Sequence, residues 1–251
     1  MVEEFKRAMM KEYEMTDLGL MKYFLGIQVQ QAKGEIFISQ EKYLNDLLKW
    51  FHMDNCKPMS TPMALNEKLR KDDGAEKADA TNYRSLVGCL IYLTNTRLDI
   101  VFAVSYVSRF MHEPSKNHHT AVKRILCYLQ GTRKLGIKYA KEADNKLIGY
   151  TDNDWAGSID DCKSTSGYLF CLSTKLISWS SKKQRTVALS SAEAEYISAT
   201  DGSSEAVWLR RLLSDMQHKE TAPTIIRCDN MSAIAMTKNP VFHSKTKHIE
   251  I

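Results

Sequence analysis

Two apolar runs that each end in an aspartate, with a glutamate-bearing helical segment between them, constrain this chain most. The first run, 147–151, ends at Asp152, and the second, 224–228, ends at Asp229. Glu195 lies in SSAEAEY (190–196), where a helical pattern begins. Hard divalent cations take oxygen ligands, and two of them about 3.5–4 Å apart stabilise both the attacking and the leaving oxygen of a phosphodiester. The pattern therefore predicts an α/β domain whose carboxylates gather around divalent cations.

The length and charge of the chain allow more than one domain and an acidic partner. With 251 residues it has room for one large domain or two of ordinary size, and 43% hydrophobic residues are typical of a chain with a buried core. The net charge of +5 permits a polyanionic partner without requiring one. Basic residues are concentrated between 116 and 146. This stretch is either a solvated helix face or a stripe that follows phosphates.

The cysteines and the hydropathy indicate the compartment. Six cysteines occur singly, without the paired spacing of a zinc site, and several lie in apolar runs where a free thiol acts as a small hydrophobe. The first 25 residues mix charged and apolar side chains, unlike a signal peptide. No apolar run approaches the roughly 20 residues that span a bilayer. We expect an intracellular protein, cytoplasmic or nuclear, with no membrane contact.

The N-terminal part is predicted to contain a hairpin between two helices. An amphipathic helix is expected at 2–13, then strands at 22–30 and 35–39 joined by a turn at Lys33–Gly34. Ser39 is expected to cap the next helix, whose apolar face runs to Phe51. Residues 56–80 carry two prolines and charges of both signs, which indicates a linker.

Three helices are expected between 82 and 131. Asp99 is expected to cap the second, Ser115 opens the third, and Gly131 ends it. Strands are predicted at 135–141, 146–152, 166–173 and 175–180. Two helical stretches follow around 191–217, then a strand at 223–229, a helix at 231–238 and a last helical segment.

Several motifs resemble one family closely. The segments YTDNDWAG (150–157), KSTSGY (163–168), ISWSSKKQ (177–184), LSSAEAEY (189–196), CDN (228–230) and NPVFHSKTKHI (239–249) resemble the ribonuclease H domain of copia-type retrotransposon polyproteins. The segments DLGLMKYFLGIQV (17–29), YRSLVGCLIYL (83–93) and VKRILCYLQGT (122–132) resemble the reverse transcriptase part of the same polyproteins. The resemblance covers essentially the whole chain.

The resemblance implies a mixed α/β fold in four parts. Residues 1–55 would be the end of a reverse transcriptase palm, 56–81 a linker, and 82–133 thumb-like or connection-like helices. Residues 134–251 would form a ribonuclease H-like mixed sheet with helices, incomplete at its C-terminal end.

The resemblance also implies hydrolysis of the RNA strand in an RNA–DNA hybrid, with Mg²⁺ or Mn²⁺ as cofactor. Asp152 would bridge two ions, with Glu195 and Asp229 as further ligands. Glu193 would support these ligands without binding an ion itself. The family's fourth aspartate would stand beyond Ile251, so we expect weak or no activity from the isolated chain. The family's Tyr-x-Asp-Asp polymerase turn is absent from this sequence, which predicts no polymerisation by this chain alone.

Contacts to nucleic acid are expected from nine residues: Gly26, Lys123, Arg124, Trp179, Lys182, Lys183, Ser190, Ser191 and Asn230. Alternatives remain for several. Trp179 is equally compatible with burial. For Ser190 and Ser191, the pattern favours capping of the following helix over contact with phosphate. Trp208 is expected in the core, and His243 and His248 at the surface or on phosphate. The rest of a retroelement polyprotein is a further expected partner. The competing hypothesis is a non-catalytic remnant or host-adopted protein that binds nucleic acid or another protein.

Overall fold

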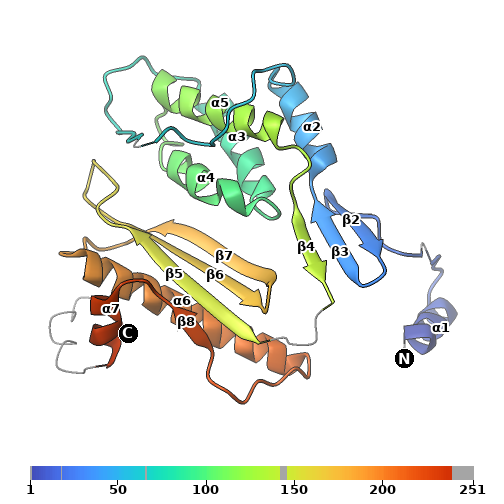
Figure 1. The fold of residues 1–251 in the computed structure, drawn as a ribbon. Helices are drawn as coiled ribbons and strands as arrows, with labels where there is room; N and C mark the ends of the chain where they lie inside the picture. The colour runs from blue at the N-terminus through green and yellow to red at the C-terminus, as the bar shows by residue number, and fades with distance from the viewer. Residues whose placement is uncertain (1, 18, 66, 142–145, 239–251) are drawn as a thin grey trace.

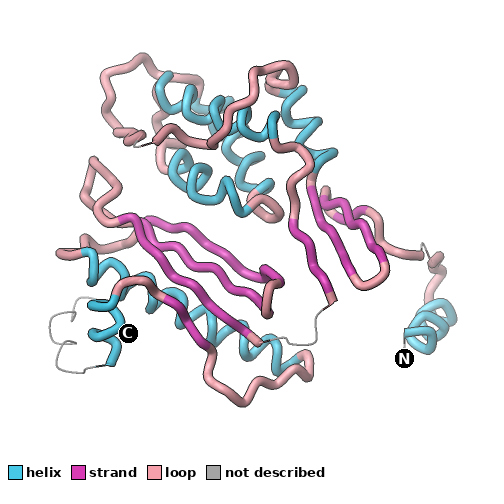
Figure 2. The backbone as a smooth tube through the Cα atoms, in the orientation of Figure 1, coloured by secondary structure: helices cyan, strands magenta, loops and turns pink. Residues whose placement is uncertain are grey.

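The computed structural model describes residues 2–17, 19–65, 67–141 and 146–238 (Figure 1). Its secondary structure is mixed, with two separate four-stranded sheets. The helices between residues 41 and 131 lie at the top of Figure 1, the first sheet lies at the right, and the second sheet lies at the lower left with the long helix α6 (Ser191–Asp215). The tube view in Figure 2 shows the two sheets as distinct bundles of strands. The described architecture is that of a ribonuclease H-like mixed sheet with an additional strand-and-helix region.

The N-terminal sheet follows helix α1 (Val2–Glu12) and contains β1 (Tyr23–Phe24), β2 (Ile27–Ala32), β3 (Glu35–Ser39) and β4 (Ile137–Ala140), all paired antiparallel. The predicted turn at Lys33–Gly34 is confirmed, with Gly34 at φ +82°. The single strand predicted at 22–30 is wrong. Leu25 and Gly26 both have positive φ and fold β1 back on β2, a conformation that glycine adopts at little cost.

Strand β4 belongs to this N-terminal sheet and not to the sheet formed by the strands after it. It pairs with β3 in a register that places Ile137 opposite Ile38. Gly136 allows the approach, because a Cβ there would lie 2.2 Å from the Ile38 carbonyl oxygen. The strand predicted at 135–141 is therefore found, but the first element assigned to the C-terminal domain pairs with the N-terminal hairpin.

The helical region consists of α2 (Glu41–Trp50), α3 (Ala80–Leu93), the short 3₁₀ helix η1 (Leu98–Ile100), α4 (Val101–Ser108) and α5 (Lys116–Gly131). These helices bury one apolar cluster that includes Leu44, Leu48, Leu90, Val104, Ile125 and Leu129. From the segment predicted as a linker, Leu69 belongs to this cluster and Met63 packs against it. Leu69 is 9% exposed, and its N–H donates to the Tyr106 hydroxyl oxygen at 3.1 Å.

Helix starts agree with the sequence in one case and differ in two. Ser115 caps α5, accepting from the His118 N–H while the His118 ring bonds back to the Ser115 N–H. Helix α2 begins after Gln40 and not after Ser39, and Gln40 makes no side-chain cap. Asp99 does not cap a helix either, because it lies inside η1 with its carboxylate turned toward Arg97.

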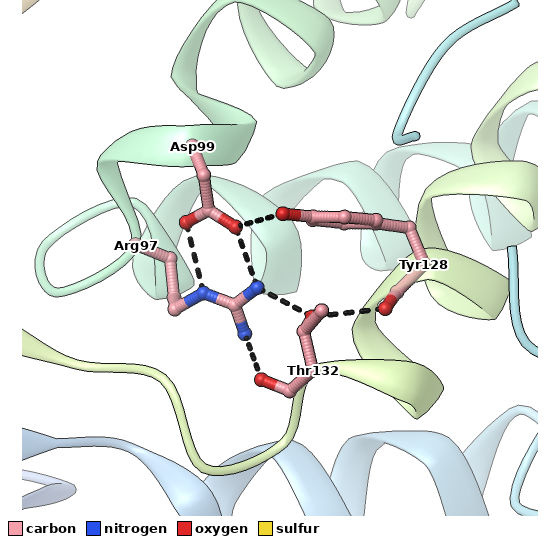
Figure 3. A network of polar contacts seen from close by, with 4 residues as sticks. All are labelled: Arg97, Asp99, Tyr128 and Thr132. Atoms are coloured by element: carbon pink, nitrogen blue, oxygen red, sulfur yellow. Dashed lines mark hydrogen bonds and ion pairs between the residues drawn. The ribbon is translucent and has the colours of Figure 1, made fainter. Parts of the chain in front are cut away.

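Arg97 and Asp99 form the centre of a polar network (Figure 3). The Arg97 side chain, 2% exposed, donates from Nε and Nη2 to the two Asp99 oxygens at 2.9 and 2.6 Å. It also donates to the carbonyl and hydroxyl oxygens of Thr132 at 3.0 and 2.7 Å. The Tyr128 hydroxyl donates to Asp99 at 2.7 Å. The network fastens η1 to the end of α5.

The C-terminal sheet contains β5 (Leu147–Asp154), β6 (Thr165–Leu172), β7 (Lys175–Lys183) and β8 (Ile225–Arg227) in the order β7-β6-β5-β8. Only the pairing of β5 with β8 is parallel. Helix α6 (Ser191–Asp215) packs on β5 and β6, and α7 (Met231–Lys238) follows β8. The two helical stretches expected around 191–217 are one helix. Gly202 lets α6 approach β5, since a Cβ there would lie 2.6 Å from the Thr151 methyl group.

The prediction that Trp208 is a core residue is wrong. Helix α6 faces the sheet with Ala206, Leu209 and Leu213, at the three-and-four spacing of one helix face. Trp208 lies beside that face and is 55% exposed. The apolar segment 206–213 contains two candidate stripes, and the packing selects the one that carries the smaller side chains.

Trp208→Ala is therefore expected to change the free energy of unfolding by no more than about 0.5 kcal/mol, as at ordinary surface positions. Leu209→Ala, its neighbour at 4% exposure, is expected to cost about 2–5 kcal/mol. Urea denaturation of the two variants measures the difference. Equal losses would contradict the helix orientation described above.

Within the described residues, no helix combines the length and the apolar character needed to cross a bilayer.

Candidate metal centre

Asp152 and Asp229 are brought together by the parallel pairing of β5 and β8. The register places Ile148 opposite Ile225 and Tyr150 opposite Arg227. Two residues beyond this last pair on each strand, the same register leads to Asp152 and Asp229. The parallel pairing thus brings two aspartates that are 77 positions apart (229 − 152) to the same end of the strands β5 and β8. We call this end of the sheet, with Asp152, Glu195 and Asp229, the carboxylate edge.

Glu195 reaches the same edge from the second turn of α6. It is 5% exposed, and its carboxylate oxygen Oε2 accepts from the Cys228 thiol at 3.7 Å. Donor atoms of Glu195, Cys228 and Asp229 all lie within 4.8 Å of one another. Asp152 is not a member of this closest group. Its Oδ1 accepts from the Asn153 N–H at 2.8 Å, and its carbonyl oxygen accepts from Ser198 at 2.7 Å.

The pKa of Glu195 reflects the two aspartates near it. The pKa of Glu195 is raised, first by burial and then by the negative charges of Asp152 and Asp229. Hydrogen bonds from Asn153 and Cys228 act in the opposite direction and do not compensate. Repulsion between ionised groups is what a bound cation relieves, so the arrangement favours cation binding.

The donor set fits a hard divalent cation such as Mg²⁺ or Mn²⁺. Asp152, Glu195 and Asp229 supply carboxylate oxygens, the ligand type that these ions prefer. The Asn153 side chain, beside Glu195, has a buried Oδ1 without a hydrogen-bond partner among the described residues. A buried oxygen without a hydrogen-bond donor is available to accept from a water bound to a cation.

Glu195→Gln is expected to raise the melting temperature at neutral pH without added metal. A carboxyl whose pKa is raised in the folded state stabilises the protein when it is protonated. That stability is lost as the pH rises from the unfolded toward the folded pKa. The uncharged amide removes this loss. Thermal unfolding at pH 7, with Glu220→Gln as control, measures the effect, and a lower melting temperature for Glu195→Gln would contradict it.

Glu193 and Ser190 serve the start of α6. The Ser190 hydroxyl oxygen accepts from the Glu193 N–H at 3.2 Å, and the Glu193 carboxylate accepts from the Leu189 N–H at 2.8 Å. Asn230 caps α7 in the same way, accepting from the Ala233 N–H at 3.0 Å. Ser190 and Asn230, expected on nucleic acid, are therefore used as helix caps. Ser191 is exposed in the first turn of α6.

The expected basic contacts fall into two places. Lys182 is exposed, and Lys183 pairs with Asp161 at 2.7 Å. Both lysines line a cleft of about 720 Å³ between β7, β6 and α6. Lys123 and Arg124 lie on α5 in the helical region, where Arg124 donates to the Thr61 hydroxyl at 2.9 Å. The basic stretch of α5 is not part of the carboxylate edge.

Trp179 and Gly26 have partners within the chain. The Trp179 indole N–H donates to the Thr94 carbonyl oxygen at 3.0 Å, and its half-buried ring lines a cleft of about 500 Å³ between β7 and helices α3 and α4. Gly26 has φ +79°, and a Cβ there would lie 2.8 Å from the Tyr92 hydroxyl. A tight turn and this contact require glycine without any nucleic acid. His243 and His248 lie outside the described residues.

Cys228 is the site residue that the sequence interpretation did not recognise. Its position directly before Asp229, at the end of an apolar run, was the available signal. The sequence predicted only that cysteines in apolar runs act as small hydrophobes, whereas the strand ends at Arg227 and the Cys228 thiol lies 3.7 Å from Glu195 Oε2.

The comparisons with known proteins agree with the fold. Residues 1–65 match the family model described as reverse transcriptase (RNA-dependent DNA polymerase). The chain is 45% identical over 241 residues to the retrovirus-related Pol polyprotein from transposon RE1 of Arabidopsis thaliana, covering 96% of this chain and 16% of that polyprotein. Against the Pol polyprotein from transposon TNT 1-94 of Nicotiana tabacum, the identity is 42%, over 100% of the chain and 19% of the relative.

A shorter relative matches as well. The chain is 41% identical to an uncharacterized mitochondrial protein of Arabidopsis thaliana, AtMg00810, over 78% of this chain and 81% of that protein. No solved structure matches. The chain spans less than a fifth of the polyproteins above, yet the matches to RE1 and TNT 1-94 run along nearly all of its own length. It belongs to the family of retrovirus-related Pol polyproteins of copia-type retrotransposons.

Proposed function

We propose that the C-terminal sheet with α6 is a ribonuclease H unit that hydrolyses the RNA strand of RNA–DNA hybrids. The observation that carries the proposal is the convergence of Asp152, Glu195 and Asp229 from β5, α6 and the end of β8. Three carboxylates that gather at this end of the sheet, one of them 95% buried, support a site for divalent cations. We further propose that residues 1–55 are the palm end, 56–81 a linker, 82–133 thumb-like helices and 134–251 the ribonuclease H-like domain, whose first strand β4 pairs with the N-terminal sheet.

Each carboxylate has a defined task in this proposal. Asp152 and Asp229 are exposed at the sheet edge and would face the scissile phosphate, while buried Glu195 holds a ligand position from the helix side. When bound, Mg²⁺ or Mn²⁺ supplies Lewis-acid stabilisation of charge on the phosphodiester oxygens. Ser198 fixes the β5 backbone at Asp152 by donating to the carbonyl oxygens of Asp152 and Gly167 at 2.7 and 3.1 Å. This bond to two strands keeps the Asp152 backbone in a set position.

Substrate contacts would come from the surface around this edge. Lys182, Arg185 and Lys183 line the cleft beside α6 and offer positive charge to a phosphate backbone. Recognition through backbone shape and the 2′-hydroxyl suits a hybrid, because base edges in such a helix are poorly accessible. The remaining parts of a Pol polyprotein are the proposed protein partners.

The direct test is cleavage of a labelled RNA–DNA hybrid by the purified chain with Mg²⁺ or Mn²⁺. We expect cleavage of the RNA strand that stops when the metal is chelated, and no cleavage of double-stranded DNA of the same sequence. A folded chain that binds the hybrid and never cuts it would overturn the proposal.

The second candidate is a non-catalytic protein that binds nucleic acid or another protein. Two observations favour it. Asp152 lies outside the closest donor group, and a separate mitochondrial protein of Arabidopsis thaliana is similar over most of its own length to this chain. Under this hypothesis the hybrid binds with and without divalent cations, and substitution at Asp152 leaves binding unchanged.

A further inference from the structure

Among the possible metal ligands at the carboxylate edge, the three that lie closest together include the sulfur atom of Cys228. Donor atoms of Glu195, Cys228 and Asp229 lie within 4.8 Å of one another, and the Cys228 Sγ is 3.7 Å from Glu195 Oε2. Glu195 comes from α6, and Cys228 and Asp229 are the first two residues after β8 ends at Arg227. Glu195 is 95% buried and directs its carboxylate at the thiol. A charged group that is withdrawn from water in this way requires a compensating partner.

A thiol changes which metal ion this site prefers. Mg²⁺ binds hard oxygen ligands and gains nothing from sulfur, whereas Zn²⁺ and Cd²⁺ bind thiolate strongly. Zn²⁺ takes mixed sulfur and oxygen ligands, with distances of about 2.3 Å to sulfur and about 2.0–2.2 Å to carboxylate oxygen. Donors within 4.8 Å of one another are compatible with that geometry, since two ligands of one tetrahedral ion stand about 3.3–3.8 Å apart.

We propose that Glu195, Cys228 and Asp229 form a site for a thiophilic divalent cation, Zn²⁺ or Cd²⁺, distinct from the set that contains Asp152. The inference rests on the proposed function only in sharing Glu195 and Asp229 with it. Binding releases the Cys228 proton to solvent, because the ligand is the thiolate. The Asn153 side chain donates a hydrogen bond to Glu195 and so holds its carboxylate, and a water would complete the coordination of the ion.

The shared carboxylates make the two modes of binding exclusive. An ion held by Cys228 occupies Glu195 and Asp229 and withdraws both from Asp152. A thiophilic ion is therefore expected to inhibit any Mg²⁺-dependent reaction at this edge at concentrations far below that of Mg²⁺. Cys228→Ser removes the soft ligand and leaves all three carboxylates in place, so it separates the two modes.

The test is titration of the purified full chain with Cd²⁺, which gives an ultraviolet thiolate-to-cadmium absorption band. We expect a band for the native sequence, a band of unchanged intensity for Cys171→Ser, and at least a tenfold loss of Cd²⁺ affinity for Cys228→Ser. Cys171 is the matched control because it is also half-buried and lies on β6 of the same sheet. Glu195→Gln is expected to weaken binding as well.

A second measurement uses the native sequence alone. Zn²⁺ is expected to protect Cys228 from alkylation more than it protects Cys171, as mapped by peptide mass spectrometry, and excess Mg²⁺ is not. Cd²⁺ binding that is unchanged in Cys228→Ser, or alkylation of Cys228 at the same rate with and without Zn²⁺, would overturn the inference. Cleavage of the hybrid with no such cadmium site would overturn this inference alone. A cadmium site without cleavage would overturn the proposed hydrolysis alone.

Discussion

Replacing Asp152 by asparagine is expected to reduce metal-dependent cleavage of an RNA–DNA hybrid by about a thousandfold. The amide keeps the size of the side chain and removes the negative charge that a divalent cation needs. Charge stabilisation by a bound cation is worth several kcal/mol at a transition state, and about 4 kcal/mol corresponds to a factor of a thousand. Single-turnover cleavage of a labelled hybrid in Mg²⁺ measures the loss.

The matched control for this variant is Asp154→Asn. Asp154 lies on the same strand, two positions further on, and is exposed like Asp152. It lies past the register position that faces Asp229, so we expect less than a threefold change. Hybrid affinity measured in chelator should be the same for both variants. Equal activities of Asp152→Asn and the native sequence would contradict the metal-centre assignment.

The second large effect is expected from Asp99→Ala, which should cost about 3–5 kcal/mol of the free energy of unfolding. The substitution leaves the Arg97 guanidinium 2% exposed without its carboxylate, and an unpaired buried charge is costly. It also removes the acceptor of the Tyr128 hydroxyl, so the contact between η1 and α5 is weakened. Urea denaturation followed by circular dichroism measures the loss.

The control for the Asp99 variant is an exposed ion pair of similar length. Lys77 and Glu113 are 2.9 Å apart, with side chains 58% and 66% exposed. Glu113→Ala is expected to cost less than about 1 kcal/mol, because solvent screens the pair. A loss from Asp99→Ala as small as that from Glu113→Ala would show that the buried network adds no stability.

The pH dependence of the Asp99 effect has a defined sign. Burial acts to raise the pKa of Asp99. The hydrogen bonds from Arg97 and Tyr128 and the positive charge of Arg97 outweigh burial, so the pKa is lowered overall. A lowered pKa contributes stability above the unfolded pKa, near 3.9, which is lost as the pH falls through the folded value. The difference between native sequence and Asp99→Ala should therefore be constant from pH 5 to 7 and shrink below pH 4.

Local sequence patterns determined most elements and the carboxylates of the candidate site. The apolar runs before Asp152 and Asp229 and the helical pattern after Glu195 all correspond to observed strands and a helix. Such patterns are reliable because alternation and helical spacing depend on near neighbours in the chain. The cap of α5 by Ser115 was predictable for the same reason.

What only the tertiary structure decided depends on contacts between distant residues. Periodicity shows that 135–141 is a strand, but it cannot show that β3 is its partner, because the Gly136 contact with Ile38 forms only on folding. Asp99 is a good cap by residue type, yet the buried Arg97 is a stronger partner for its charge. Helix α6 has two apolar stripes, and the shape of the sheet selects that of Leu209 over that of Trp208.

In the candidate site too, local sequence pattern determined which residues are present, and packing determined how they are grouped. Sequence alone predicted that Asp152 and Asp229 follow apolar strand-forming runs and that Glu195 lies in a helix, because each is set by local pattern, although β5 continues past Asp152 to Asp154. The tertiary structure decided how they group, through the parallel register of β5 and β8 and the position of α6 on the sheet. It placed Cys228 beside Glu195 and left Asp152 outside the closest group, because side-chain distances depend on how the elements pack.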